Sequence, residues 1–416
     1  MMYLQHGPPF MRQVMNIVLN MNRISCFVSA MAFCLSITAS DFVPSGFSRP
    51  LHWNVGAELT PAWVPGSNGF LKGNNNAGKH INAAFSGSVR ADFNFDQSTR
   101  EGMLYKGLYQ GIGLGATTFF SNSLLGTPVS AYVYQGAPFV YFNDCLRLAY
   151  EWQFGAAFGW KHYDLETADN NAVVSTAVTA HMGLGLKLQY ILSERWQMSF
   201  GISANHYSNG NTSWPNAGVN YIGASIGLTY TINPQKGGNA ILDSGIIEEA
   251  DRGRWFYDLM AYGAWRKRVV SVGNPSEPQL CPGKFGIAGL QFSPMRSLNR
   301  WVAIGPSLDV QWDESAGLSP YWVEGTSGDM IKFRRPPIGK QIGVGLSAHA
   351  ELTMPIFSVN VGIGYDIINP MGDKAFYQSL TLKTFVTRNL YLNAGYSLGS
   401  FKDPQNLMLG IGIRIR

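Results

Sequence analysis

The sequence predicts an all-β protein: an antiparallel transmembrane β-barrel of about 16 strands, arranged as two related halves of eight. The chain of 416 residues is 46% hydrophobic but only 14% charged, whereas soluble domains carry about 25% charged residues. Short segments of alternating hydrophobicity recur along most of the chain, separated by turn residues. The mean hydropathy is −0.02, and after the N-terminal region no apolar run reaches the ~18 residues of a spanning helix. These observations favour a barrel over a helical membrane protein.

The segment 146–161 shows the alternation most clearly, because one of its faces is large and aromatic while the other is small and polar. Side chains on a strand alternate between two faces with a period of two residues. The small, polar set could not form a dry core, so we place the apolar set in lipid. The apolar set is Leu148, Tyr150, Trp152, Phe154, Ala156, Phe158 and Trp160.

The same alternation predicts eight strands in each half of the chain. Turns between them alternate between short and long, as in barrels with short periplasmic turns and long outer loops. The first eight strands are expected at 52–64, 80–95, 109–121, 128–142, 146–161, 173–192, 195–211 and 220–232. The second eight are expected at 254–270, 282–298, 300–312, 340–354, 356–368, 374–386, 389–400 and 406–416.

The expected organisation has four parts. Residues 1–40 have the order of a secretory signal peptide, because a basic residue precedes an apolar run and small residues follow. Residues 41–232 form the first barrel half, 233–253 a periplasmic linker, and 254–416 a second, degenerate half. The halves could share one large barrel or close separately. Growth of barrels by added hairpins slightly favours one barrel, whereas small inward residues suit narrow eight-stranded interiors.

Polar residues that suit acyl-transfer chemistry gather where one predicted strand ends and the next begins. His206 and Ser208 continue the outward row of the strand 195–211, and Asn220 opens the outward row of 220–232. Serine hydrolysis needs a nucleophile, a base and a group that orients the base. Neighbouring strands lie about 4.8 Å apart, so Asn220 can reach an imidazole one strand away. The candidates are Ser208 as nucleophile, His206 as base and Asn220 as orienting group, with Asn209, Gly210 and Asn216 near the oxyanion.

At these residues the chain resembles a known family. His206-Tyr207-Ser208-Asn209, followed by Pro215-Asn216-Ala217-Gly218, is similar to the PagL family of outer-membrane lipid A 3-O-deacylases. The resemblance covers about residues 52–232 and is sharpest over 204–232. It implies an eight-stranded barrel with a lipid-facing His-Ser-Glu triad. It also implies roles for His206 as base, for Ser208 as nucleophile, and for Asn209 and Asn216 around the oxyanion.

The chain departs from this family at Asn220, where the family has a glutamate. Asparagine can accept a hydrogen bond from imidazole but cannot stabilise imidazolium by charge, and such a replacement can cost about 10⁴ in rate. The second half has Tyr396 and Leu398 where the first has His206 and Ser208. We therefore expect at most one active copy.

Two functions stay open, together with a third that needs a wide pore. The first is Ser/His hydrolysis of a lipid A acyl ester. The alternative is a catalytically inactive barrel that serves as scaffold or subunit of an outer-membrane protein complex. The third is transport through a lumen of roughly 16 strands, which requires an open pore.

Expectations about ligands and location follow from the same residues. The expected partner is lipopolysaccharide or lipid A of the outer leaflet, in the cell outer membrane after Sec-type export. We expect no cofactor, and no metal because the cysteines and histidines lack metal-ligand spacing. We also expect no nucleic acid, since the net charge of +5 comes without a basic run. Four inward-facing side chains are expected to form a lumenal ion-pair network: Arg147, Glu151, His181 and Lys187.

Overall fold

The computed structural model describes residues 51–163, 171–210, 212–234, 252–272, 277–281, 283–322, 331–370, 372, 375–401 and 403–416. The predicted signal peptide (1–40) and most of the predicted linker (233–253) lie outside the described residues. Within the described part of the chain, no helix is both long enough and apolar enough to cross a membrane.

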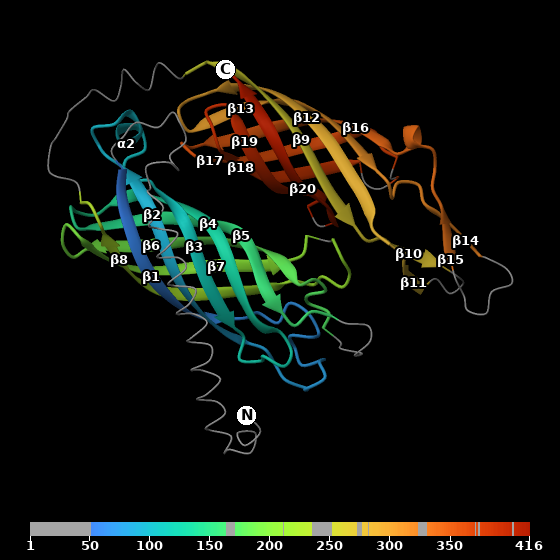
Figure 1. The fold of residues 1–416 in the computed structure, drawn as a ribbon, viewed down its shortest axis with the longest axis horizontal. Coiled ribbons are helices and arrows are strands. Elements are labelled where there is room, and N and C mark those ends of the chain that lie inside the picture. Colours follow the sequence, from blue (N-terminus) through green and yellow to red (C-terminus); the bar gives the residue numbers. More distant parts are fainter. Residues whose placement is uncertain are drawn as a thin grey trace, which may run out of the picture. The chain divides into compact units, whose positions relative to one another are not determined.

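The first eight strands close on themselves as an antiparallel barrel (Figure 1). Closure is made by β1, which pairs with β2 on one side and with β8 on the other. The strands are β1 (Leu51–Trp63), β2 (Ala83–Phe95), β3 (Tyr109–Thr118), β4 (Gly126–Tyr141), β5 (Leu146–Trp160), β6 (Val178–Ile191), β7 (Trp196–Ser208) and β8 (Val219–Thr231).

The second half forms its own closed barrel, in which the last strand pairs with the first. Its strands are β9 (Trp255–Arg266), β12 (Phe285–Ser297), β13 (Val302–Asp313), β16 (Ile342–Thr353), β17 (Phe357–Ile368), β18 (Phe376–Phe385), β19 (Leu390–Gly399) and β20 (Asp403–Ile415). The preference for one large barrel is therefore wrong. The small inward residues correctly predicted narrow eight-stranded interiors. Because each half closes separately, a lumen of roughly 16 strands does not form.

All sixteen predicted strands are present, with ends that differ by a few residues from those expected. The structure adds short elements in the loops that the alternation did not predict. These are the hairpin β10 (Val269–Val272) with β11 (Glu277–Leu280), the hairpin β14 (Ser319–Trp322) with β15 (Ile331–Arg334), the helix α2 (Arg100–Leu104) and the 3₁₀ turn η1 (Ile338–Lys340).

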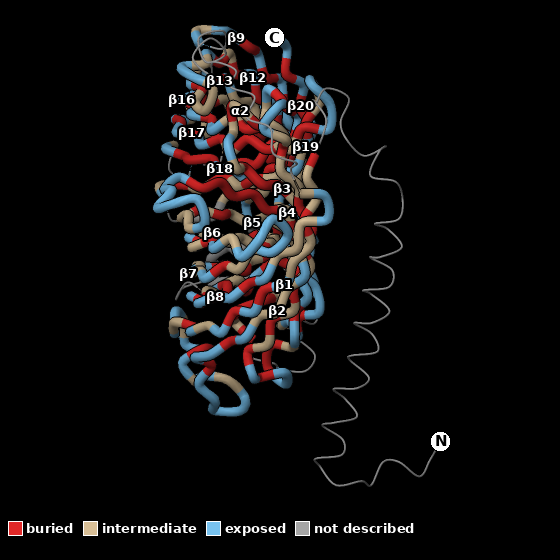
Figure 2. Tube along the Cα trace, turned by 90° about the vertical axis from the view of Figure 1, so that its left-hand side faces the viewer, coloured by how far each residue is buried: buried red, intermediate tan, exposed pale blue. Residues whose placement is uncertain are grey.

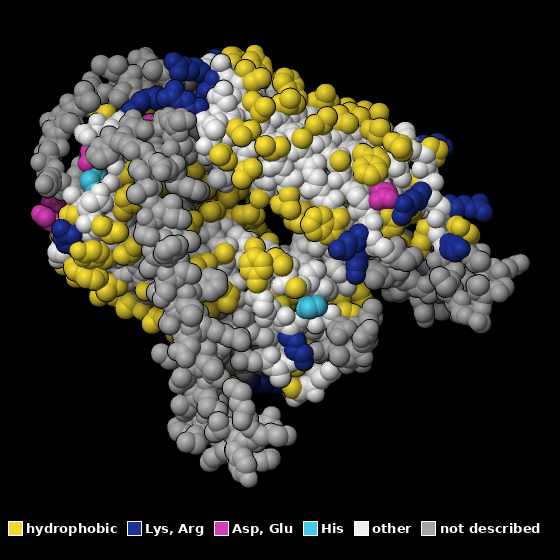
Figure 3. Space-filling model, in the orientation of Figure 1, with side chains coloured by type: hydrophobic (Ala, Val, Ile, Leu, Met, Phe, Trp, Pro, Cys, Tyr) yellow, Lys and Arg dark blue, Asp and Glu magenta, His cyan; other side chains and the backbone are white. Residues whose placement is uncertain are grey.

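The two faces of the strands differ as the sequence predicted. Along the strands, buried and exposed positions alternate (Figure 2). Hydrophobic side chains cover the outer surface of the strands, whereas charged side chains gather toward their ends (Figure 3). For example, Leu184, Ile202 and Ile222 on adjacent strands are 65%, 62% and 52% exposed. Such a surface matches the outward apolar band of a membrane barrel.

Each lumen holds a buried cluster of four charged side chains. In the first barrel, Arg90 lies 2.9 Å from Glu58 and 2.5 Å from Glu151, and Lys187 contacts both carboxylates. The predicted network is thus correct for Glu151 and Lys187 but wrong for the other two members. Arg147 bonds to Gln189 and Gln197, and His181 lies 3.3 Å from the amide oxygen of Asn205. The missed partners, Glu58 and Arg90, come from strands distant in sequence.

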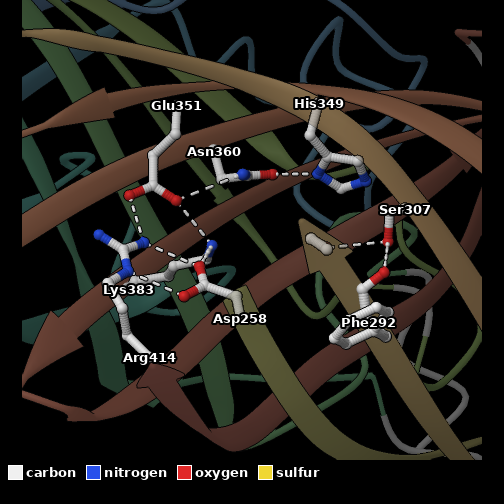
Figure 4. Close-up of polar contacts among 9 residues, drawn as sticks. Asp258, Phe292, Ser307, His349, Glu351, Asn360, Lys383 and Arg414 are labelled. Carbon is white, nitrogen blue, oxygen red and sulfur yellow. Dashed lines mark hydrogen bonds and ion pairs between the residues drawn. The ribbon is translucent and has the colours of Figure 1, made fainter. Parts of the chain in front are cut away.

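The second lumenal cluster joins Asp258, Glu351, Lys383 and Arg414 (Figure 4). Arg414 donates two hydrogen bonds of 2.8 Å to Asp258 and one of 2.6 Å to Glu351. Lys383 lies 2.6 Å from Asp258 and 2.7 Å from Glu351. Two acids and two bases neutralise each other in each barrel, which is the condition for keeping charges in a buried site.

Candidate active site on the first barrel

The predicted nucleophile, base and orienting group lie on one outward face at the loop end of β7 and β8. His206 and Asn220 are cross-strand partners, and Ser208 follows two residues after His206. All three are partly exposed, whereas the residues between them point into the barrel. The inward, buried neighbours are Asn205, Tyr207, Val219 and Tyr221.

His206 and Asn220 form a side-chain hydrogen bond across the two strands. The Nδ1 atom of His206 lies 2.7 Å from Oδ1 of Asn220. Because an amide oxygen only accepts, Nδ1 carries the hydrogen in this pair, and the neutral imidazole presents a free lone pair at Nε2. The orientation and tautomer are those of a general base in a triad.

Ser208 shares the face of His206 but is not hydrogen-bonded to it. Within the described residues, no hydrogen bond joins the Ser208 hydroxyl to the imidazole. Positions two apart on a strand are about 6.6 Å apart along it, so the two side chains must lean toward each other to meet. Triad hydrogen bonds are often long without substrate and tighten in the complex.

Gly218 packs against the same pair from the loop side. Its φ of +69° lies in the left-handed region that favours glycine. A Cβ at this position would lie 3.1 Å from Cε1 of His206 and 3.6 Å from Cβ of Ser208. The glycine therefore leaves room for the imidazole beside the serine.

The loop 209–218 is held by its own amide side chains. Oδ1 of Asn216 accepts a hydrogen bond of 3.0 Å from the backbone N–H of Asn209. The side-chain amide of Asn209 donates to the Ser175 hydroxyl and to the carbonyl of Ser213. The backbone and side-chain donors of Asn209 are thus engaged within the loop and with Ser175. The side-chain NH₂ of Asn216 has no hydrogen-bond acceptor among the described residues.

A second segment braces this loop. The backbone N–H groups of Ala217 and Gly218 donate to the carbonyls of Ala172 and Val173 at 3.0 and 3.1 Å. Asn171 in turn fixes that segment, because its side chain accepts from Val173 and Val174 and donates to Lys161. Three stretches of chain are therefore tied together around the site.

Tyr207 anchors the site from inside the barrel. Its ring is fully buried, stacks on His181 at a centroid distance of 4.8 Å, and meets Trp160 edge-on at 5.2 Å. Its hydroxyl lies 3.1 Å from the Thr117 hydroxyl. Tyr207 also belongs to a hydrophobic cluster that fills the loop end of the lumen. The strand that presents His206 and Ser208 is thereby fixed on its opposite face.

Comparison with known proteins now identifies the chain. Residues 47–229 match the family model of lipid A 3-O-deacylase (PagL), and residues 255–416 match that of the acyloxyacyl hydrolase C-terminal domain. The chain belongs to the PagL family. It is an outer-membrane β-barrel protein of that family, with a PagL match on the first barrel and the C-terminal-domain match on the second.

Three solved structures illustrate what this PagL-family chain is similar to. Neisserial surface protein A (NspA) is 11% identical over 44% of this chain and 100% of its own, with a TM-score of 0.30. The siderophore receptor PirA from Acinetobacter baumannii is 8% identical over 85% and 68%, with a TM-score of 0.22. The translocator domain of the autotransporter NalP from Neisseria meningitidis is 8% identical over 95% and 98%, with a TM-score of 0.17. No curated protein matches the chain.

The second barrel of this PagL-family chain lacks the outward polar group. In the hairpin formed by β19 and β20, Tyr396 pairs with Leu407 and Leu398 pairs with Pro404. Neither strand contains a histidine. The connection between them spans only residues 400–402, whereas residues 209–218 connect β7 and β8.

The lumen of the second barrel holds a serine, a histidine and an asparagine that sequence reasoning missed. The hydroxyl of Ser347 lies 2.9 Å from Nε2 of His349, and Nδ1 of His349 lies 2.5 Å from Oδ1 of Asn360. Figure 4 shows His349 and Asn360 beside the charged cluster. All three side chains are buried, and Ser347 also donates to Asp309. The inward parity of Ser347 and His349 on one predicted strand was the available signal.

Proposed function

We propose that the first barrel hydrolyses a fatty-acyl ester of lipid A at the outer leaflet, with Ser208 as nucleophile and His206 as base. The observation that carries this proposal is the 2.7 Å contact between His206 Nδ1 and Asn220 Oδ1 on the lipid-facing side. Membership of the family named for lipid A 3-O-deacylation supports the choice of substrate.

The chemistry follows from the tautomer that Asn220 selects. Nε2 of His206 takes the hydroxyl proton as Oγ of Ser208 attacks the ester carbonyl carbon. The tetrahedral intermediate collapses, the ester C–O bond breaks, and His206 returns the proton to the departing sugar oxygen. Water then attacks the acyl-serine, again with His206 as base, and releases the fatty acid.

Two groups near Ser208 are suited to the developing oxyanion. The side-chain NH₂ of Asn216 is free within the described residues, and Gly210 adds a backbone N–H in a stretch where φ is +61°. Asn209 follows Ser208 directly in the chain, and its backbone N–H holds Asn216 in place. Donors aimed at the oxyanion typically contribute about 10² to 10³ in rate each.

The neutral amide of Asn220 also favours the alternative function, an inactive barrel that is a scaffold or subunit of an outer-membrane complex. An amide orients the imidazole without stabilising its charged form. The proposal therefore predicts a slow hydrolase, whereas the alternative predicts none.

The deciding experiment is mass spectrometry of lipid A from cells that produce the full chain, Ser208→Ala or Ser203→Ala. Ser203 lies on the same strand and faces inward, so its substitution is the matched control. We expect one acyl chain to be lost with the parent and Ser203→Ala but retained with Ser208→Ala. Identical lipid A in all three strains, with each protein folded in the outer membrane, would leave the scaffold function.

A further inference from the structure

The outer surface of the second barrel carries a groove of about 610 Å³. Specific ligand sites typically have volumes of about 300–1,000 Å³. The floor of the groove consists of glycine, proline and alanine residues on β13 and β16. Larger aliphatic side chains flank this floor. The lining is Trp255, Arg296, Ile304, Gly305, Pro306, Ala348, His349, Ala350, Val361 and Ile363.

The ladder between β12 and β13 is interrupted at the groove. Pairing between β12 and β13 runs as far as Phe292 with Leu308 and resumes only at Arg296 with Ile304. Pro294 and Pro306 lie within this gap, and proline has no N–H to donate to a ladder. Across the gap, the hydroxyl of Ser307 lies 3.2 Å from the carbonyl oxygen of Phe292 (Figure 4).

Gly305 allows β13 to approach the backbone of β12 closely at the same place. A Cβ on Gly305 would lie 2.0 Å from the carbonyl oxygen of Pro294, so no larger residue fits without moving the backbone. On the neighbouring strand, Ala348 is the cross-strand partner of Pro306, and Ala350 that of Ile304. The outward side chains at this place are therefore short, which keeps the floor of the groove low.

The groove runs from the short-turn end of the barrel toward the middle of its wall. Five of its residues form a row of cross-strand partners. Counted from the short-turn end, each residue lies one position further along its strand than the previous residue of the row. The row is Trp255, Arg296, Ile304, Ala350 and Val361. Four strand spacings of about 4.8 Å make the row roughly 19 Å long. Because strands tilt by about 35–45°, the row descends roughly 12 Å, which is nearly the depth of one leaflet.

The shallow end of this row carries an unpaired positive charge. Arg296 is exposed, points outward, and has no hydrogen bond or ion pair within the described residues. Its cross-strand partner Trp255 is 52% exposed on the same face. Tryptophan is typical of the membrane interface, and arginine recognises phosphate through a planar fork of donors. The short turns place this end at the periplasmic leaflet.

We propose that this groove is a binding site for one anionic glycerophospholipid of the periplasmic leaflet. Arg296 binds the phosphate, Trp255 lies at the level of the glycerol, and one acyl chain lies along Pro306, Ala348 and Ala350. The site is separate from the chemistry of the first barrel, so it stands whether or not Ser208 is a nucleophile.

The test is native mass spectrometry of the full, detergent-purified chain, delipidated and titrated with phosphatidylglycerol. The chain should retain one phosphatidylglycerol. Arg296→Gln should weaken retention roughly tenfold, as for loss of a charge-assisted hydrogen bond. Ala350→Phe, which fills the groove, should abolish it. Matched controls are Arg388→Gln, an exposed arginine of a short turn, and Ala261→Phe, an outward alanine outside the groove. Both controls should retain the lipid.

Equal retention by the parent, Arg296→Gln and Ala350→Phe would overturn the site, since only unspecific lipid would then remain. Equal loss in Ala261→Phe or Arg388→Gln would do the same. Retention of lipid A in place of phosphatidylglycerol in a competition would overturn the assigned ligand. If Ala350→Phe fails to fold, as judged by heat-dependent migration on gels, Arg296→Gln decides alone, because its side chain is exposed and unpaired.

Discussion

The two barrels of this chain keep the same interior chemistry but differ at the rim. Each lumen neutralises two acids with one arginine and one lysine, although Arg90 lies on β2 and Arg414 on β20. At the loop end, the first barrel is filled by a hydrophobic cluster that includes Tyr207. The second has a polar pocket of about 70 Å³, lined among others by Asp309 and Asp366. The lumenal ion cluster is therefore common to both narrow barrels. The outward polar site, in contrast, occurs in the barrel whose loop end is filled by the hydrophobic cluster.

The largest effect should come from restoring a carboxylate beside His206. Asn220→Glu should raise the deacylation rate by up to about 10⁴, because an anion stabilises the imidazolium that forms in the transition state. Quantitative mass spectrometry of released fatty acid measures this change. Ala217→Glu is the control, since it adds the same charge at an exposed position of the adjoining loop. No gain with Asn220→Glu would contradict the role given to His206.

The next effect tests whether the two lumenal clusters are equivalent. Arg414→Met leaves Asp258 and Glu351 with only Lys383, and Arg90→Met does the same in the first barrel. Each should lower the free energy of unfolding by about 3–5 kcal/mol, the usual cost of breaking a buried ion network. Urea titration of the refolded protein in lipid, followed by tryptophan fluorescence, measures it. A loss of unfolding free energy in only one of the two variants would show that the two clusters contribute unequally to stability.

A smaller effect should come from Gly218, which has no counterpart in the short connection of the second barrel. Gly218→Ala forces alanine into a left-handed conformation, at a cost of about 1–2 kcal/mol. It also places a methyl group against His206, so we expect a roughly tenfold slower deacylation. Gly78→Ala is the control, because Gly78 also has positive φ but open space around it. Equal activity of both variants would argue against close packing at the imidazole.

The smallest effect is expected from moving the pair into the second barrel. Tyr396→His combined with Leu398→Ser should yield no hydrolysis in a Ser208→Ala background. Leu407 is the partner of Tyr396, so no amide would orient the new imidazole. Lipid A mass spectrometry would report any activity. A measurable rate would mean that the loop and the orienting amide matter less than proposed.

The sequence pattern was sufficient to predict the local features of the strands. It was not sufficient to predict how the strands close into barrels. Alternation with a period of two fixes which residues of a strand face lipid, so His206, Ser208 and Asn220 could be placed on one face. It says nothing of whether β8 pairs with β1 or continues into β9, because that pairing joins residues far apart in the chain. The partners Glu58 and Arg90 were missed for the same reason. The hairpins in the loops lack the length that alternation needs to be detected.

The pleat of β7 has a consequence for how the first barrel would meet its substrate. Tyr207 points inward while His206 and Ser208 point outward, so the atoms proposed to react face the bilayer and not the lumen. A lipid would then reach the serine by lateral diffusion in two dimensions. The rate should follow the mole fraction of substrate in the surface rather than its bulk concentration. Diluting the lipid with inert detergent at constant total substrate should slow the reaction in proportion.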